Sequence, residues 1–330
     1  MASGRFLRKL IKTGVENSKE EFFRVAEEII REERAKNHHL LANDLERILY
    51  GIHQGNGFSS RVSHDIPKDR ERSLPLLEVR EPLRDLKDIV VSDENKSILE
   101  EVIFEYSRSE VLASHGLKPI SKLLFCGPPG CGKTLAGEVL ASELSLEFVI
   151  VRFDAVVSSF LGETSSNLRK VFTFLEGGCF VGLFDEFDAI GKERNDPSEH
   201  GELKRVVNSF LQMMDGYRGK SILIAATNHE GLLDKALWRR FDEVLLFEPP
   251  NLEQIKQLFN VKLRGVHWEL PIGDVSFLNK FKGFSHADIE RILIRATKTM
   301  VLKGRKYLTV DLIEEAFRRE EKRQNIITKI

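Results

Sequence analysis

The sequence predicts an α/β protein in which helices cover both faces of a mainly parallel β-sheet, followed by a small all-helical domain. Short apolar runs alternate with helical stretches between Leu83 and Pro250, and this alternation is typical of parallel strands joined by crossover helices. From Asn251 onward the chain shows helical periodicity instead. With 330 residues, 42% of them hydrophobic and 31% charged, the chain has the composition of a globular protein.

Two helical patterns occupy the N-terminal region, residues 1–50. In "SKEEFFRVAEEIIREERAK" apolar residues recur at helical spacing, with Ser18 as the expected N-cap and Glu21 three residues later. The apolar stripe comprises Phe22, Val25, Ala26, Ile29 and Ile30. The stretch "HHLLANDLERIL" repeats this pattern. Because these apolar faces are short, we expect a helical region that binds a partner or client.

Three further regions complete the expected organisation. Residues 51–82 are rich in glycine, serine and charged residues, which predicts a flexible linker. The α/β domain is expected over residues 83–250 and the helical domain over residues 251–330. The α/β domain begins with the helical stretch "NKSILEEVIFEYSRSEVL". Its expected strands are the apolar runs "KLLFCG", "EFVIVRFDA", "CFVGLFDE", "SILIAATN" and "EVLLFEPP".

Charge balance and cysteine content argue against several classes of function. The formal net charge is −1, so no basic surplus favours nucleic acid or an anionic membrane surface. The three cysteines, Cys126, Cys131 and Cys179, are too few for a disulfide framework or a zinc site and suit a reducing cytosol. No apolar run reaches the roughly 18 residues of a membrane helix, and no signal-peptide core begins the chain. We therefore expect a soluble cytoplasmic protein.

The stretch "GPPGCGKT" fits the phosphate-binding pattern G-x-x-x-x-G-K-[ST]. It lies between a predicted strand and a predicted helix, where its backbone N–H groups and the helix N-terminus can surround phosphate oxygens. Lys133 would reach the β- and γ-phosphates, and the Thr134 hydroxyl could ligate Mg²⁺. A chance glycine-rich turn is the alternative, which the flanking strand and helix oppose. The expected nucleotide contacts are Gly127, Pro128, Pro129, Gly130, Cys131, Gly132, Lys133, Thr134 and Leu135.

Polar residues close two later strands. Asp185 and Glu186 end "FVGLFDE", and the carboxyl edge of a parallel sheet is where α/β proteins bind ligands. Asp185 would hold Mg²⁺, while Glu186 would polarise the attacking water. Asn228 ends "SILIAATN" and could contact both the γ-phosphate and that water. Taken alone, an acidic strand end or a turn-forming asparagine would be ordinary, but the phosphate loop upstream favours the functional interpretation.

Together, "GPPGCGKT", "GLFDEFDAIG", "MDGY", "AATN", "LDKALWRRFD" and "GFSHADI" resemble the motifs of AAA ATPases, the protein-remodelling branch of the AAA+ superfamily. The resemblance runs from about Leu83 to Arg323. It implies a P-loop NTPase sheet with a helical lid, ATP and Mg²⁺ as cofactors, and a homo-oligomeric ring, as a hexamer. It also matches Arg239 and Arg240 to the paired arginine fingers of the katanin and spastin group, which act in the neighbouring subunit's site. An arbitrary arginine pair would otherwise be a solvated helix end.

The resemblance assigns further roles. "SSFLGETSS" is similar to the family's first pore loop, with Phe160, Leu161 and Gly162 as the step that grips a polypeptide client, and His200 falls where a second pore loop would be. Asp188 would lie at the subunit interface, as would the signalling segment made of Asp215, Gly216 and Tyr217. Ala287 would contact nucleotide at the start of the lid.

The chain departs from the family pattern at three places. Cys131 stands where the family has threonine or serine, and a thiol beside a helix N-terminus can have a lowered pKa and be oxidisable. His286 replaces a glycine, which puts the second sensor contact in doubt. "DIVV", residues 88–91, replaces "DIGG" but still offers apolar contacts to adenine.

We therefore expect an ATP-hydrolysing protein unfoldase or remodeller. The N-terminal helices resemble those of bacterial AAA ATPases paired with subtilisin-like serine proteases, which implies a protease partner; the chain itself carries no serine-protease or HExxH motif. Two other classes remain open. A clamp-loader-like machine linked to nucleic acid is opposed by the neutral charge and by the lack of a basic stripe. A monomeric P-loop switch is opposed by the missing NKxD motif, since "NKSI" at Asn95 lies upstream of the phosphate loop and ends in Ile98.

Overall fold

The computed structural model describes residues 19–35, 45, 65–69, 73–156, 161–187, 197–228 and 238–327. The chain divides into two compact units, Met1–Asp65 and Ile66–Ile330. In the first unit the predicted helix forms as α2, Lys19–Ala35, and buries Val25, Ile29 and Ile30 of the apolar stripe. The expected N-cap, Ser18, lies outside the described residues.

The second unit is built on a six-stranded sheet with the order β1-β3-β4-β5-β2-β6. Its strands are β1 (Leu77–Arg80), β2 (Lys122–Cys126), β3 (Glu147–Val151), β4 (Phe180–Phe184), β5 (Ile222–Thr227) and β6 (Glu243–Leu246). Strands β2 to β6 pair in parallel, and β1 pairs antiparallel with β3 at the edge. All five predicted strands are present, and the α/β fold class is confirmed.

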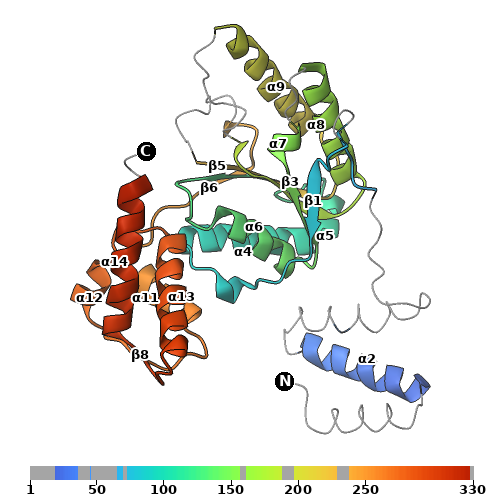
Figure 1. The fold of residues 1–330 in the computed structure, drawn as a ribbon. Helices are drawn as coiled ribbons and strands as arrows, with labels where there is room; N and C mark the ends of the chain where they lie inside the picture. Colours follow the sequence, from blue (N-terminus) through green and yellow to red (C-terminus); the bar gives the residue numbers. More distant parts are fainter. Residues whose placement is uncertain are drawn as a thin grey trace. The chain divides into compact units, whose positions relative to one another are not determined.

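Helices cover both faces of this sheet, as the apolar strands require (Figure 1). Core residues of α8 and α9 pack with one set of strand side chains, and those of α4 and α6 pack with the other set. Elements before the last strand include a 3₁₀ turn, η1 (Leu86–Asp88), and the helices α4 (Asp93–Ser107), α5 (Ser109–Ser114), α6 (Lys133–Glu143), α7 (Phe153–Val156), α8 (Leu161–Glu176) and α9 (Pro197–Gly216).

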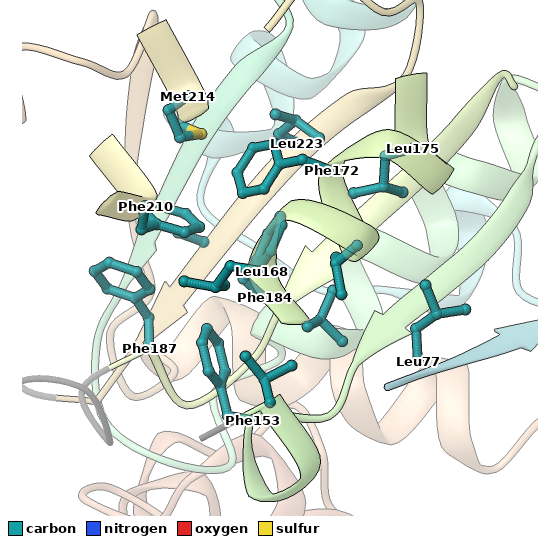
Figure 2. Close-up of a cluster of buried hydrophobic side chains, with 14 of the residues drawn as sticks. Leu77, Phe153, Leu168, Phe172, Leu175, Phe184, Phe187, Phe210, Met214 and Leu223 are labelled. Carbon is teal, nitrogen blue, oxygen red and sulfur yellow. The ribbon is translucent and has the colours of Figure 1, made fainter. Parts of the chain in front are cut away.

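A cluster of aromatic side chains fixes the carboxyl end of β4 (Figure 2). The Phe184 ring lies 5.5 Å from that of Phe172 in α8 and 5.1 Å from that of Phe210 in α9. Phe187 lies 4.7 Å from the same Phe210 ring. Each such buried ring contributes about 1.5–3 kcal/mol of transfer free energy. The two residues between Phe184 and Phe187 are therefore anchored on both sides.

Strand β1 lies inside the predicted linker over residues 51–82 and was missed. Its backbone pairs with all but the first residue of β3, from Leu77 opposite Val151 to Arg80 opposite Phe148. Leu76 and Leu77 are buried in the core beside α8. The strand is only four residues long, "LEVR", and half of it is charged, so neither periodicity nor composition distinguishes it from a linker.

The helical region after the sheet consists of α11 (Leu252–Lys262), α12 (Val275–Asn279), α13 (His286–Leu302) and α14 (Val310–Ile327). The expectation of an all-helical domain was wrong in one detail, because Trp268–Glu269 (β7) and Leu308–Thr309 (β8) pair as a two-residue parallel ladder. Strands of two residues leave no readable pattern. Val90 belongs to the hydrophobic core of this lid. Within the described ranges, no helix is long and apolar enough to cross a membrane.

Candidate functional site

The phosphate loop is bent by three glycines with positive φ: Gly127 at 138°, Gly130 at 78° and Gly132 at 99°. Side-chain-bearing residues rarely adopt these conformations. A Cβ atom on Gly127 would collide with the carbonyl oxygen of Phe247 and lie 2.8 Å from its carbonyl carbon. The loop therefore passes against the chain that leaves β6, and only glycine fits there.

Lys133 opens α6 directly after the loop and is buried, with 6% of its surface exposed. Its Nζ donates hydrogen bonds to the carbonyl oxygens of Gly127 (2.6 Å) and Pro128 (3.0 Å) and to Oδ1 of Asn228 (2.8 Å). The ammonium group is thus held inside the loop, where a phosphate oxygen can exchange with one of these acceptors. The same contacts bring the end of β5 to the phosphate loop.

Thr134 and Asp185 form the pair expected to hold Mg²⁺. The hydroxyl of Thr134 donates to Oδ2 of Asp185 over 2.8 Å. Hydroxyl and carboxylate oxygens suit Mg²⁺, and neighbouring ligands of an octahedron with bonds of about 2.1 Å lie about 3 Å apart. The residues present therefore fit the ion.

Glu186 projects from a strained backbone position. Its φ is +53°, an uncommon angle for a residue with a side chain, and its backbone N–H donates to Oδ1 of Asp185 over 2.9 Å. Its side chain is exposed and lines the same cavity as Lys133 and Thr134. This turn lies between the buried rings of Phe184 and Phe187.

The lid closes directly on the phosphate loop. The backbone N–H of Ala287 donates to the carbonyl oxygen of Gly130 over 3.0 Å. Ser285 caps α13 by accepting from the N–H of Asp288, whose carboxylate accepts from the backbone N–H of Ser285 in return. The first turn of α13 is therefore fixed against the loop, and Ala287 lies beside Gly130.

A cavity of about 340 Å³ extends from the phosphate loop to the lid. Lys133, Thr134, Asp185, Glu186 and Asn228 line its polar end. The other end contains the apolar side chains of Ile89, Val90 and Leu258, together with His286. Pockets of this size commonly bind cofactors, with apolar walls and a few polar groups. With phosphates on the loop, a nucleoside would extend to the apolar end, as expected for "DIVV".

His286 contributes a neutral ring to this apolar end. Burial lowers the pKa of His286 to about 4; the charge of Lys262 lowers it as well, and the backbone of Val90 acts in the opposite direction. Both ring nitrogens are shielded from solvent and make no hydrogen bond of normal geometry with any residue that the structure describes. The ring therefore acts as a mainly apolar wall near neutral pH.

The expectation of a reactive Cys131 was wrong. Its side chain is 1% exposed and belongs to the core beneath the loop. Burial raises the pKa of the Cys131 thiol, and the opposing charge of Lys133 does not compensate. The helix N-terminus is close by, but desolvation of the thiolate is the larger effect.

Arg239 and Arg240 lie far from this site. They form the exposed turn before β6, and Asp242 then accepts hydrogen bonds of 2.9 Å from the backbone N–H groups of Ser121 and Lys122, at the start of β2. The phosphate loop follows the opposite end of β2, a five-residue strand that spans about 13 Å at about 3.3 Å per residue. The arginines therefore cannot reach the phosphate loop of their own chain.

The remaining predicted residues belong to the expected pore loop and to the expected subunit interface. Leu161 and Gly162 form the first turn of α8, so that part of the predicted loop is helical; Phe160 and Asp188 lie outside the described residues. Asp215 ends α9 beside Gly216 and forms an ion pair with Arg240 of the same chain.

The expected interface role of Tyr217 does not suit its position. Its ring is 5% exposed, its hydroxyl donates to the carbonyl oxygen of Leu175 over 3.2 Å, and it accepts from the N–H of Ser221 over 3.1 Å. These bonds hold Tyr217 inside its own core, so Asp215 and Gly216 are left as the surface residues of this segment.

Sequence reasoning missed one pair that lines the cavity. Lys262 of α11 and Glu290 of α13 are joined by a hydrogen bond of 2.8 Å between Nζ and Oε1. They are separated by 28 positions and belong to no recognisable motif, so no sequence signal could have brought them together.

Comparison with known proteins identifies the family of this chain. Residues 123–249 match the model of the ATPase family associated with various cellular activities (AAA). The chain is 39% identical over 326 residues to an uncharacterized AAA family ATPase, y4kL, of Sinorhizobium fredii, covering 98% of this chain and 97% of that protein.

Two other relatives match this chain over only part of their own length. A putative 26S proteasome regulatory subunit homolog of Methanocaldococcus jannaschii is 32% identical over 60% of this chain and 54% of its own length. The ATP-dependent zinc metalloprotease FtsH 2 of Symbiobacterium thermophilum is 30% identical over 70% of this chain and 41% of its own length. The chain thus spans about half or less of these two relatives. Its family model match and its full-length similarity to the Sinorhizobium protein show that the chain belongs to the AAA family and is an ATPase.

Proposed function

We propose that this ATPase works as a homo-oligomeric ring, as a hexamer, that remodels or unfolds protein by threading a polypeptide through a central pore. ATP binds in the cavity between the phosphate loop and the lid. Mg²⁺ on Thr134 and Asp185 would neutralise phosphate charge. Glu186 would orient and polarise the attacking water, while Lys133 and Asn228 would contact the γ-phosphate.

The observation that carries the proposal is the position of Arg239 and Arg240. They lie at the amino-terminal edge of the parallel strands, opposite the phosphate loop. Asp242 holds this turn in place by accepting hydrogen bonds from the backbone at the start of β2. A guanidinium that stabilises transition-state charge can raise turnover by about 10³–10⁵-fold, but these two cannot do so in their own chain. In a ring built by head-to-tail contacts, this edge would face the neighbour's nucleotide. The katanin- and spastin-like pairing of the arginines fits this arrangement.

Threading is supported by the sequence at the start of α8. Phe160, Leu161 and Gly162 would form the gripping step, and an aromatic side chain there can contact many client sequences. Two relatives carry names that concern proteolysis, the proteasome regulatory homolog and the zinc metalloprotease. We propose that residues 1–50 select a client or a partner protease of the subtilisin-like type. The full-length match to the Sinorhizobium protein includes this region.

Mixing two inactive variants tests the shared site. Arg240→Ala should lose the trans-acting charge, and Glu186→Gln should lose the water-polarising group, so each alone should hydrolyse ATP at least a hundredfold more slowly. In an equimolar mixture, about a quarter of the sites combine an intact Glu186 with an intact neighbouring Arg240. Turnover should therefore reappear on mixing.

Arg218→Ala is the matched control, because Arg218 also contacts Asp215, through its carbonyl oxygen at 3.3 Å, yet has no proposed role in catalysis. It should retain turnover within about twofold, in line with the small effect of most surface substitutions. Normal turnover by Arg240→Ala alone, or no recovery in a mixture whose mass shows co-assembly, would refute the shared site.

A further inference from the structure

The lid supplies one charged pair to the nucleotide cavity, at the end away from the phosphate loop. Lys262 lies in the last turn of α11 and Glu290 in the second turn of α13, and both line the cavity. The side chain of Lys262 is 16% exposed and that of Glu290 is 36% exposed. The pair is therefore partly shielded from solvent, unlike most surface ion pairs.

The direction of α13 places this pair on the nucleoside side. Ala287 binds the loop through its bond to the carbonyl oxygen of Gly130. Glu290 lies three residues further along the same helix, about 4.5 Å along its axis at about 1.5 Å per residue. Lys262 lies one helical turn after Leu258 on α11, and both residues line the cavity, so Lys262 belongs to the apolar end.

Both members of the pair keep hydrogen-bonding capacity. The only hydrogen bond that joins them, among the residues the structure describes, runs from Nζ of Lys262 to Oε1 of Glu290. An ammonium group has three donors and a carboxylate has two acceptor oxygens. Oε2 of Glu290 and two donors of Lys262 are thus available to a bound molecule. Around them, Ile89, Val90 and Leu258 offer apolar side chains. Asp88 also lines the cavity, but both of its carboxylate oxygens already accept hydrogen bonds, from Arg264 (3.1 Å) and from the N–H of Asp85 (3.2 Å). Lys262 and Glu290 are therefore the polar side chains of the lid that can fix orientation there.

We infer that Glu290, held by Lys262, accepts a hydrogen bond from the nucleoside half of the bound nucleotide and thereby sets nucleoside selectivity. An ionised carboxylate can only accept hydrogen bonds, and a fully ionised phosphate chain offers it none. The nucleoside offers two kinds of donor, the ribose hydroxyls and the exocyclic amine of adenine. This contact rests on the proposed binding of nucleotide in the cavity, and Glu290 would make it in a single chain as well as in a ring.

A cycle of protein and ligand deletions tests the contact. Binding of ADP, 2′-deoxy-ADP, 3′-deoxy-ADP and purine riboside diphosphate, which lacks the amine, would be measured by calorimetry for the full-length wild-type protein and for Glu290→Ala. In the wild type, the analogue that lacks the contacted donor should bind about tenfold more weakly than ADP. In Glu290→Ala that penalty should fall below about twofold. The analogue concerned identifies the ribose or the base as the source.

Two variants separate recognition from packing of the lid. Glu290→Gln keeps an acceptor of the same length and should retain most of the discrimination. Glu314→Ala removes a matched ion pair of 2.8 Å, Lys280–Glu314, whose members do not line the described cavity, and should leave discrimination unchanged. The inference is overturned if Glu290→Ala weakens ADP and every analogue by the same factor. It is also overturned if the wild type binds all four ligands equally.

Discussion

Replacing Gly127 with alanine should damage the phosphate loop more than any other glycine substitution in it. The added Cβ atom would meet backbone, namely the carbonyl group of Phe247, and not a movable side chain. The N–H of Phe247 donates to the carbonyl oxygen of Cys126 over 2.7 Å, just before Gly127. The two chains are thus tied together where the methyl group would have to separate them.

Two other glycines indicate how much unfolding free energy the alanine substitution should cost. Gly116 has φ of +74° and Gly132 has φ of +99°, and a Cβ atom on either would meet no other heavy atom within 4 Å. Alanine at these positions should cost only conformational strain, about 1–2 kcal/mol. At Gly127, with φ of +138°, strain and overpacking together should cost about 3–5 kcal/mol. That is a large part of the roughly 5–15 kcal/mol that stabilises a typical domain.

Urea unfolding and ADP titration should be measured for the alanine variants of Gly116, Gly127, Gly130 and Gly132. Gly116→Ala should bind ADP normally, because Gly116 does not line the cavity, while Gly127→Ala should lose detectable binding even where it remains folded. Alanine at Gly130 should give an intermediate result, since its Cβ atom would lie 2.8 Å from the Ser285 hydroxyl, which can rotate. Equal unfolding free energies for Gly127→Ala and Gly132→Ala would refute the reasoning from the Phe247 contact.

Three further predictions concern ionisation, thiols and metal. The pKa of His286 is about 4 in the folded chain against an ordinary 6.5. The free energy of unfolding therefore has its full value above pH 6.5, where the ring is neutral in both states, and decreases as the pH falls toward 4, because only the unfolded state gains the proton. Between pH 7 and pH 5 the loss should be roughly 2 kcal/mol, and unfolding curves of His286→Ala should lack it; an unchanged slope would contradict the buried neutral ring. Cys126 and Cys131 are buried whereas Cys179 is exposed, so a thiol reagent should label the native protein once and the denatured protein three times; fast labelling that persists in Cys179→Ser would show that the core opens. Asp185→Asn should weaken ATP binding about tenfold when Mg²⁺ is present but little in EDTA, and an equal loss in both would argue against metal ligation.

The elements that could be predicted from the sequence are those whose pattern is formed by residues adjacent in the chain. Each parallel strand contains an apolar run of at least three residues, so β2, β4 and β5 could be predicted directly. The glycine pattern predicted the phosphate loop between β2 and α6. The neighbours of these elements in space were less accessible. Nothing in the sequence joins Asp242 to Ser121, and these bonds are what place the arginine pair at the far edge of the sheet.

Two site residues show where local reasoning fails. Proximity to a helix N-terminus predicted a lowered pKa for Cys131, but burial, which depends on residues distant in sequence, raises it. Similarly, "MDGY" matched an interface motif, yet Tyr217 is held in the core by Leu175 and Ser221. In both cases tertiary burial outweighed the local pattern.

Strand β1 also determines where the catalytic unit can be cut. A fragment that began at residue 83, the predicted start of the domain, would expose the backbone edge of β3, whose sequence is "EFVIV". It would also remove Leu76 and Leu77, each worth about 1.5–3 kcal/mol of burial. An uncovered apolar edge strand invites pairing with other chains. A fragment that begins at Ile66, the start of the second compact unit, retains this strand and is the better choice for expressing the ATPase without its N-terminal region.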